Sequence, residues 1–170
     1  MFKKLFLFVA FIIVFGGCEE KIAFDSDYND SFTLWTNSKK ERGDDYEFTL
    51  NTSSVFGFSS NTIITVINGK IVSRKYEAFQ NNGSSPENVL IDTWVENEEN
   101  LNTHTEGAEA VSLDEIYQRC YSNILSVDEN DNFIYFENEN DGLLSLCNYI
   151  AKECQDDCSI GYRVTKIVWL

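Results

Sequence analysis

The sequence predicts an α+β domain of two layers, an antiparallel sheet with helices on one face, in the chain order helix, hairpin, helix, meander. An Asn-Gly dipeptide lies between two β-branched runs, which is a strong local signal for a hairpin. Apolar residues at helical spacing follow that hairpin, and three strand-like segments end the chain. Several antiparallel strands beside few helices are typical of two layers. Residues 30–170 suffice for one such domain.

The first 17 residues have the pattern of a secretory signal peptide. Two lysines lie within residues 1–4, an unbroken apolar run covers residues 5–15, and two glycines precede Cys18. This run is much shorter than the roughly 20 residues that a membrane-spanning helix needs. We therefore predict that residues 1–17 direct export and are then removed.

The segment Phe15-Gly16-Gly17-Cys18 resembles the lipobox of bacterial lipoproteins, although Phe15 stands where leucine is usual. The resemblance implies that a diacylglycerol is attached to the Cys18 sulfur and that a dedicated peptidase cuts before this residue. Two acyl chains hold a protein stably on a membrane. We expect a lipid-anchored protein of the bacterial cell envelope, at the outer membrane, bound through the lipid on Cys18. The alternative is an ordinary secreted protein.

The chain is strongly acidic, with a net charge of −15 at pH 7. Without Lys3 and Lys4 it holds 11 basic and 28 acidic residues, so the net charge of the mature chain is −17. Such a charge repels nucleic acid and anionic lipid and favours a cationic protein or peptide as partner. The alternative is an acidic surface that serves only solubility. The aromatic fraction of 14% indicates a folded globule.

The N-terminal part of the mature chain predicts a tether, a helix and a strand. Residues 18–29 are mostly polar and acidic, which is typical of a lipidated tether. Asp30 or Ser31 can cap a first helix that ends at Gly43. Alternating apolar residues from Tyr46 to Leu50 predict a strand with one buried face, and the apolar run at residues 55–58 extends it.

The segment 62–73 predicts a hairpin whose turn is Asn68-Gly69, because both residues accept the positive φ of a type I′ turn. This turn places Val66 opposite Ile71, with Val66 toward the core. Residues 80–87 are polar and predict a surface loop. Residues 89–95 predict an edge strand.

The rest of the chain predicts a second helix and three strands. Ser112-Leu113-Asp114-Glu115 is a capping box, and apolar residues follow it at helical spacing. The three predicted strands cover residues 133–137, 143–150 and 162–169, with a turn at residues 140–142 between the first two.

Several of these segments together suggest a family. They are Tyr46-Glu47-Phe48, Asn68-Gly69-Lys70, Ser112-Leu113-Asp114-Glu115 and the last strands. This set resembles small exported bacterial lipoprotein domains that have no known activity, so it implies fold and location only. Members often have a cysteine pair near the first hairpin, where this chain has none. The order of elements is also similar to peptidase-inhibitor-like and β-lactamase-inhibitor repeats, which bind proteins.

The sequence offers little for catalysis. His104, in a polar segment, is its one histidine, and no nucleophile motif such as G-x-S-x-G is present. Cys154 and Cys158 have too few neighbouring ligands for a zinc site, and the acidic segment 137–142 lacks the bidentate glutamate of a calcium loop. We therefore nominate no catalytic residue, no metal and no cofactor.

We expect a protein that is not an enzyme and that binds a protein or peptide or has a structural role. The alternative is a small secreted hydrolase, or an inhibitor of a secreted enzyme. An enzyme should have a concave pocket with perturbed ionisable groups. A binding module should have an exposed apolar patch or an open sheet edge.

Four cysteines remain once Cys18 is assigned to lipid, and an exported chain should pair them as two disulfides. Cys120 lies on the apolar face of the second predicted helix, and Cys147 lies on a strand that this helix should cover. We therefore favour Cys120 with Cys147 and Cys154 with Cys158. The main alternative joins Cys147 to one loop cysteine and Cys120 to the other.

Overall fold

The computed structural model describes residues 22–81, 88–156 and 158–170, so the predicted signal peptide and Cys18 lie outside the described residues. The fold is broadly α+β, as predicted, with a larger sheet than expected. Two helices, α1 (Asp25–Arg42) and α2 (Leu113–Arg119), accompany one seven-stranded antiparallel sheet of order β4-β3-β2-β1-β7-β6-β5. The strands are β1 (Tyr46–Ser53), β2 (Phe58–Ile67), β3 (Lys70–Gln80), β4 (Val89–Asn97), β5 (Asn132–Glu137), β6 (Leu146–Ala151) and β7 (Ile160–Trp169).

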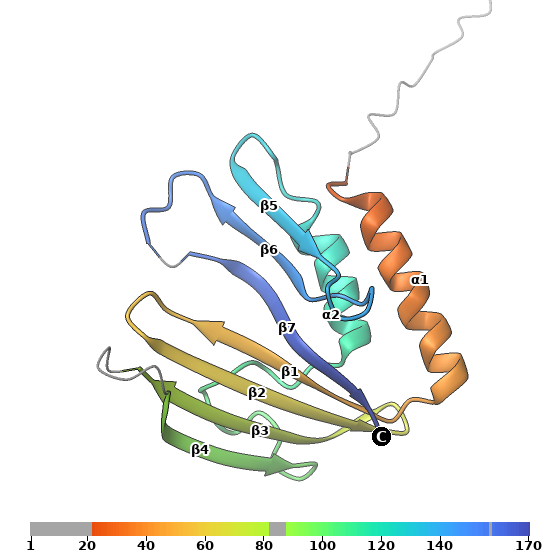
Figure 1. Cartoon of the computed structure of the whole chain (residues 1–170), viewed down its shortest axis with the longest axis vertical. Helices are drawn as coiled ribbons and strands as arrows, with labels where there is room; N and C mark the ends of the chain where they lie inside the picture. The colour runs from red at the N-terminus through yellow and green to blue at the C-terminus, as the bar shows by residue number, and fades with distance from the viewer. Residues whose placement is uncertain (1–21, 82–87, 157) are drawn as a thin grey trace, which may run out of the picture.

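One face of the sheet carries the hydrophobic core. Side chains of β1 alternate between buried and half-buried, and its buried residues Tyr46, Phe48 and Leu50 join the same cluster as residues of α1 and α2. Figure 1 shows the two helices side by side next to strands β5 to β7. The segment 98–111 packs on the same face over β2, β3 and β4, because its backbone contacts the inward side chains of these strands.

Helix α1 starts at Asp25, earlier than the predicted cap at Asp30 or Ser31. Its buried face is Tyr28, Ser31 and Trp35, which recur at helical spacing. The Tyr28 ring lies between α2 and β5, with centroids 6.0 Å from both Tyr117 and Phe136. This packing stabilises the start of α1, where the local sequence is rich in acidic residues and has too few apolar residues to predict a helix. Gly43, with a φ of 96°, ends the helix as predicted.

The prediction that residues 18–29 form a tether is wrong for residues 22–29. Ala23 is buried, and its N–H donates to the Leu125 carbonyl oxygen at 3.1 Å. Phe24 follows as the N-cap of α1 with a φ of 55°. Residues 22–29 thus belong to the domain, which begins earlier than the predicted boundary at residue 30.

The predicted hairpin is confirmed, and its strands are longer than expected. Asn68 and Gly69 have φ values of 50° and 72°, as a type I′ turn requires, and Val66 lies opposite Ile71. The run 55–58 does not extend β1 as predicted, because the chain reverses there. Val55 and Phe56 form the turn between β1 and β2 and are 82% and 83% exposed.

Helix α2 begins at the predicted capping box, where the Ser112 hydroxyl accepts from the Glu115 N–H at 3.2 Å. A short π-helix, Cys120–Ile124, continues it. Tyr117 of α2 is fully buried and links three elements: its hydroxyl bonds the Ser31 hydroxyl at 2.8 Å and accepts from the Leu144 N–H at 2.9 Å. These bonds connect α2 to α1 and to the segment before β6.

The three predicted C-terminal strands are confirmed as β5, β6 and β7, but β7 changes partner along its length. Its first residues pair with β6, and from Val164 onward it pairs with β1. At the change, Leu50 lies opposite Val164 after a register shift. The end of β1 and the start of β7 therefore diverge (Figure 1) and leave a cleft.

The four late cysteines pair as the sequence favoured. Cys120 is joined to Cys147, with their Cα atoms 6.0 Å apart, and both are fully buried where the π-helix Cys120–Ile124 packs on β6. Cys154 is joined to Cys158 within the connection between β6 and β7, with a Cα separation of 6.2 Å.

We expect the Cys120–Cys147 bridge to contribute more to stability than the local bridge, because it closes the longer loop. Replacing both Cys120 and Cys147 by alanine should lower the free energy of unfolding by roughly 3 kcal/mol. Equilibrium denaturation with urea measures this loss in the free energy of unfolding. The pair Cys154→Ala and Cys158→Ala is the matched control, and an equal or larger loss in that control would contradict the expectation.

Candidate functional site

Strand β4 is an edge of the sheet and has a free side. It pairs antiparallel with β3, and within the described residues no strand pairs with its other side. This confirms the edge strand predicted at residues 89–95. An unpaired strand edge offers a row of N–H and C=O groups to which an extended chain can add as a further strand.

The start of β4 is apolar and exposed. Val89, Leu90 and Ile91 are 52%, 50% and 55% exposed. A β-bulge explains how three neighbours can all face solvent: Leu90 pairs with Phe79 and Asp92 with Ala78, so Ile91 is the extra residue.

The β1–β2 turn adds to this apolar surface. The Gln80 amide nitrogen donates to the Phe56 carbonyl oxygen at 3.2 Å, and Gln80 pairs with Val89, so the turn and the start of β4 lie at one end of the sheet. We call Val55, Phe56, Val89, Leu90 and Ile91 together the β4 corner. Exposed apolar surface of this kind marks interaction sites.

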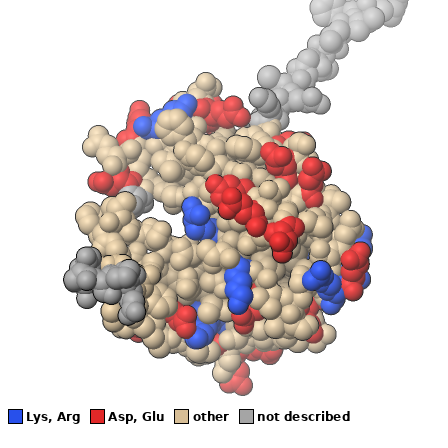
Figure 2. Space-filling model, in the orientation of Figure 1, with Lys and Arg blue, Asp and Glu red and all other residues tan. Residues whose placement is uncertain are grey.

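Strand β4 contains no lysine and no proline. These two residue types are common guards of an edge against strand addition. Of the charged residues of β4, Asp92 is exposed and Glu96 is buried, and the exposed Glu98 and Glu99 follow directly. On the face seen in Figure 2, basic side chains are scattered among acidic ones rather than gathered in a patch. The charge at this edge therefore favours a cationic segment.

A buried ion pair holds β4 to β3 and to the segment 98–111. Arg74 Nε lies 3.2 Å from Glu96 Oε2, and the two side chains are 3% and 0% exposed. The Arg74 guanidinium also donates to Asn102 Oδ1 at 2.6 Å and to the carbonyl oxygens of His104 and Glu106. One arginine thus fixes three points of the covering segment.

Glu96 accepts several hydrogen bonds in its ionised form. Burial raises the pKa of this carboxyl, but the N–H groups of His104 and Asn102, both at 2.7 Å, and the Thr103 hydroxyl outweigh burial. The net result is a pKa of about 2, against an ordinary value of 4.5. Glu96 is therefore ionised at neutral pH, and Arg74 and these hydrogen bonds balance its charge.

Two aromatic rings close this cluster. The His104 ring stacks on Trp94 with centroids 4.3 Å apart, and Trp94 also packs against the Arg74 guanidinium at 4.5 Å. His104 Nδ1 lies 3.0 Å from Glu96 Oε1. The sequence indicated only a lone histidine in a polar loop, whereas the structure places the His104 ring against Trp94 and Glu96 of the buried cluster.

The sequence analysis missed Arg74 and Glu96. A signal was present, because strand side chains alternate: if Tyr76 faces the core, Arg74 faces it too, and the same holds for Trp94 and Glu96. Arg74 and Glu96 are directly opposite each other in the register of β3 and β4.

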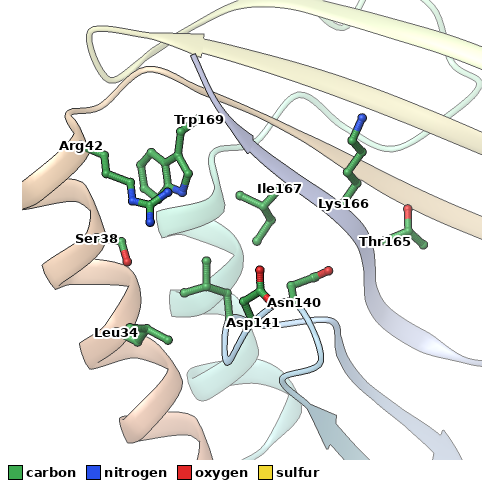
Figure 3. A pocket seen from close by; sticks show the side chains of 10 residues that line it. Leu34, Ser38, Arg42, Asn140, Asp141, Thr165, Lys166, Ile167 and Trp169 are labelled. Carbon is green, nitrogen blue, oxygen red and sulfur yellow. The ribbon is translucent and has the colours of Figure 1, made fainter.

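A cavity of about 530 Å³ opens where β1 and β7 diverge. Another, of about 380 Å³, lies between α1 and β7 (Figure 3). There the Arg42 guanidinium lies beside the Trp169 ring, while Lys166 points away from both. The pKa is shifted for Tyr28, Tyr46, Glu96, Tyr117 and Arg119, and of these Arg119 borders a cavity, beside Tyr162.

The acidic segment 137–142 forms the turn predicted at residues 140–142, and the acidic residues 128–132 form a turn as well. The Asp128 carboxylate accepts from the Asn130 N–H, and Asn140 bridges to Leu143. No three metal-binding side chains come together among the residues that the structure describes. In the same residues, no helix has the length and the apolar character needed to cross a membrane.

Comparison with known proteins adds no relative. No protein family, no curated protein and no solved structure matches the chain. The resemblance to exported lipoprotein domains and to inhibitor-like repeats stays a prediction.

We expect Glu96→Gln to destabilise the domain by about 3 kcal/mol or more at pH 7, because it leaves the buried Arg74 guanidinium without its partner. Urea denaturation at pH 7 measures the loss. The exposed Glu98→Gln is the matched control and should change the free energy of unfolding little.

The same variant should change the response to acid. Because the pKa of Glu96 is lower in the folded chain than in the unfolded one, its contribution is complete above about pH 4.5 and is lost as the pH falls toward 2. The stability of Glu96→Gln should therefore depend less on pH between 4.5 and 2. Equal slopes in the parent chain and the variant would contradict this assignment.

Proposed function

We propose that this protein is a lipid-anchored, non-catalytic module of the bacterial cell envelope, at the outer membrane, that binds an extended cationic segment of another protein. The segment adds to the free side of β4 as an eighth strand, and its apolar side chains contact the β4 corner. Main-chain hydrogen bonds supply affinity in this mode, and side-chain contacts supply specificity.

The observation that carries the proposal is the state of the β4 edge. It is unpaired within the described residues, has no guarding lysine or proline, and borders an exposed apolar corner in an acidic protein. The buried pair of Arg74 and Glu96 keeps the edge fixed in position, which lowers the entropy cost of binding.

If the protein were a hydrolase, the alternative function, it would need an acid–base pair that faces a cavity. The best pair among the described residues is Glu96 with His104. Glu96 is fully buried, and its oxygens already accept from Asn102, Thr103 and His104. This arrangement supports a structural role for the pair, so we favour binding over hydrolysis.

Lipidation at Cys18 is tested by growing cells in labelled palmitate. We expect the parent protein to take up label and to remain in the membrane fraction, and Cys18→Ala to do neither. An unlabelled parent protein, or a Cys18→Ala protein that is still retained in membranes, would exclude the anchor.

Strand addition is tested with the mature chain, residues 18–170 with Cys18→Ser, and an octapeptide of alternating lysine and valine. We expect the peptide to shift the backbone NMR signals of β4, and an octapeptide of alternating glutamate and valine to shift none. Ile91→Lys with Val95→Lys should weaken binding about tenfold, because lysine repels the peptide and removes apolar contact.

The control for this experiment is the other edge of the sheet. Phe133→Lys with Tyr135→Lys places the same charges on β5 and should leave peptide affinity unchanged. Shifts centred on β5, or equal losses from both pairs of substitutions, would exclude β4 as the binding edge.

A further inference from the structure

The chain enters the domain at the sheet edge opposite β4. Strand β5 is the last strand on that side, and the Tyr28 ring near the start of α1 contacts Phe136 of β5. Ala23 is fixed to Leu125 by a backbone hydrogen bond. Figure 1 shows the start of α1 beside β5 and away from β4. The point where an anchor on Cys18 would reach the domain is therefore set by packing.

Exposed aromatic side chains lie on the elements at this edge of the sheet, on both of its faces. Of the six exposed aromatic residues in the described part of the chain, only Phe56 belongs to the β4 corner. The other five, which we call the tether-end aromatics, are Phe24, Phe32, Tyr121, Phe133 and Tyr135. The Tyr28 ring ties the helical members together, with centroids 5.9 Å from Phe32 and 5.0 Å from Tyr121. Phe133 and Tyr135 lie on β5, where they alternate with the core-facing Ile134 and Phe136 and therefore project from the sheet face opposite the helices.

Little chain is left between the anchor and this end. Four peptide units join Cys18 to Ile22, and fully extended they span at most roughly 14 Å. The 18 residues of α1 are longer, at about 27 Å. A lipid on Cys18 therefore keeps the tether-end aromatics within reach of the bilayer surface, whatever conformation the linking residues adopt.

We propose that the tether-end aromatics lie in the boundary between headgroups and acyl chains of the bilayer that holds the anchor. The β5 edge then faces the membrane and the β4 edge faces away from it. Tyrosine is enriched at this depth of a membrane, and phenylalanine is common on the apolar face of segments that lie there. Asp25, Asp27 and Asp131 border this end, so its preferred surface is zwitterionic lipid rather than anionic lipid. The inference depends on the lipidation proposed above.

The test replaces the natural anchor, so that its outcome does not depend on lipidation at Cys18. The mature chain with Cys18→Ser and an N-terminal hexahistidine tag is bound to phosphatidylcholine vesicles that contain a nickel-chelating lipid. Tryptophan reporters are introduced singly as Phe133→Trp at β5 and Phe56→Trp at the β4 corner. Brominated phosphatidylcholine quenches tryptophan that enters the acyl region.

We expect quenching of Phe133→Trp well above that of the parent chain, and quenching of Phe56→Trp equal to that of the parent. Phe133→Ser with Tyr135→Ser should weaken vesicle affinity about tenfold, because apolar surface is lost from the contact. The matched pair Val55→Ser with Phe56→Ser should not change it. Replacing part of the phosphatidylcholine by phosphatidylglycerol should reduce the quenching.

Three results would overturn the inference. The first is equal quenching of the two reporters, and the second is no quenching of Phe133→Trp beyond the parent chain. The third is dimerisation in solution that Phe133→Ser with Tyr135→Ser abolishes, since this would assign the tether-end aromatics to a second copy of the chain. Failure of palmitate labelling with the predicted quenching would instead exclude the natural anchor alone.

Discussion

The packing of α1 against the sheet is the constraint on which the rest of the molecule depends. Trp35 is fully buried, and its ring centroid lies 5.0 Å from that of Tyr46 and 5.3 Å from that of Trp169. About two helical turns earlier, Tyr28 packs against Tyr117. Burial of such large rings dominates core energetics. If Cys18 carries the proposed anchor, α1 is the first described element after it, and this packing then sets which sheet edge is nearest to the membrane.

The two edges of the sheet differ in chemistry as well as in position. The β4 corner is mainly aliphatic and rests on a fixed strand, since Arg74 and Glu96 bind β3, β4 and the segment 98–111 together. The opposite end is aromatic and lies where the chain enters. If the β5 edge faces a bilayer and the β4 edge faces a partner, every copy of the protein presents strand β4 to that partner.

Features with a local cause could be predicted from the sequence. Asn68-Gly69 specifies its own turn, Ser112 caps its own helix, and the pairing of Cys120 with Cys147 follows once a helix covers a strand. Other features depend on contacts between distant segments. The start of α1 is set by Tyr28 against β5, and Arg74 is balanced by a glutamate on another strand. His104 looked isolated because its partners Trp94 and Glu96 are positioned by the fold.

Hydrogen–deuterium exchange on the lipidated protein tests the central claim, that the two edges face different surroundings. It is measured in detergent, on phosphatidylcholine vesicles, and on vesicles with the lysine–valine peptide. We predict that vesicles slow exchange in β5 and at the start of α1 but not in β4, and that the peptide then slows exchange in β4. Protection of β4 by vesicles alone, or exchange in β5 that is the same with and without a bilayer, would contradict the account.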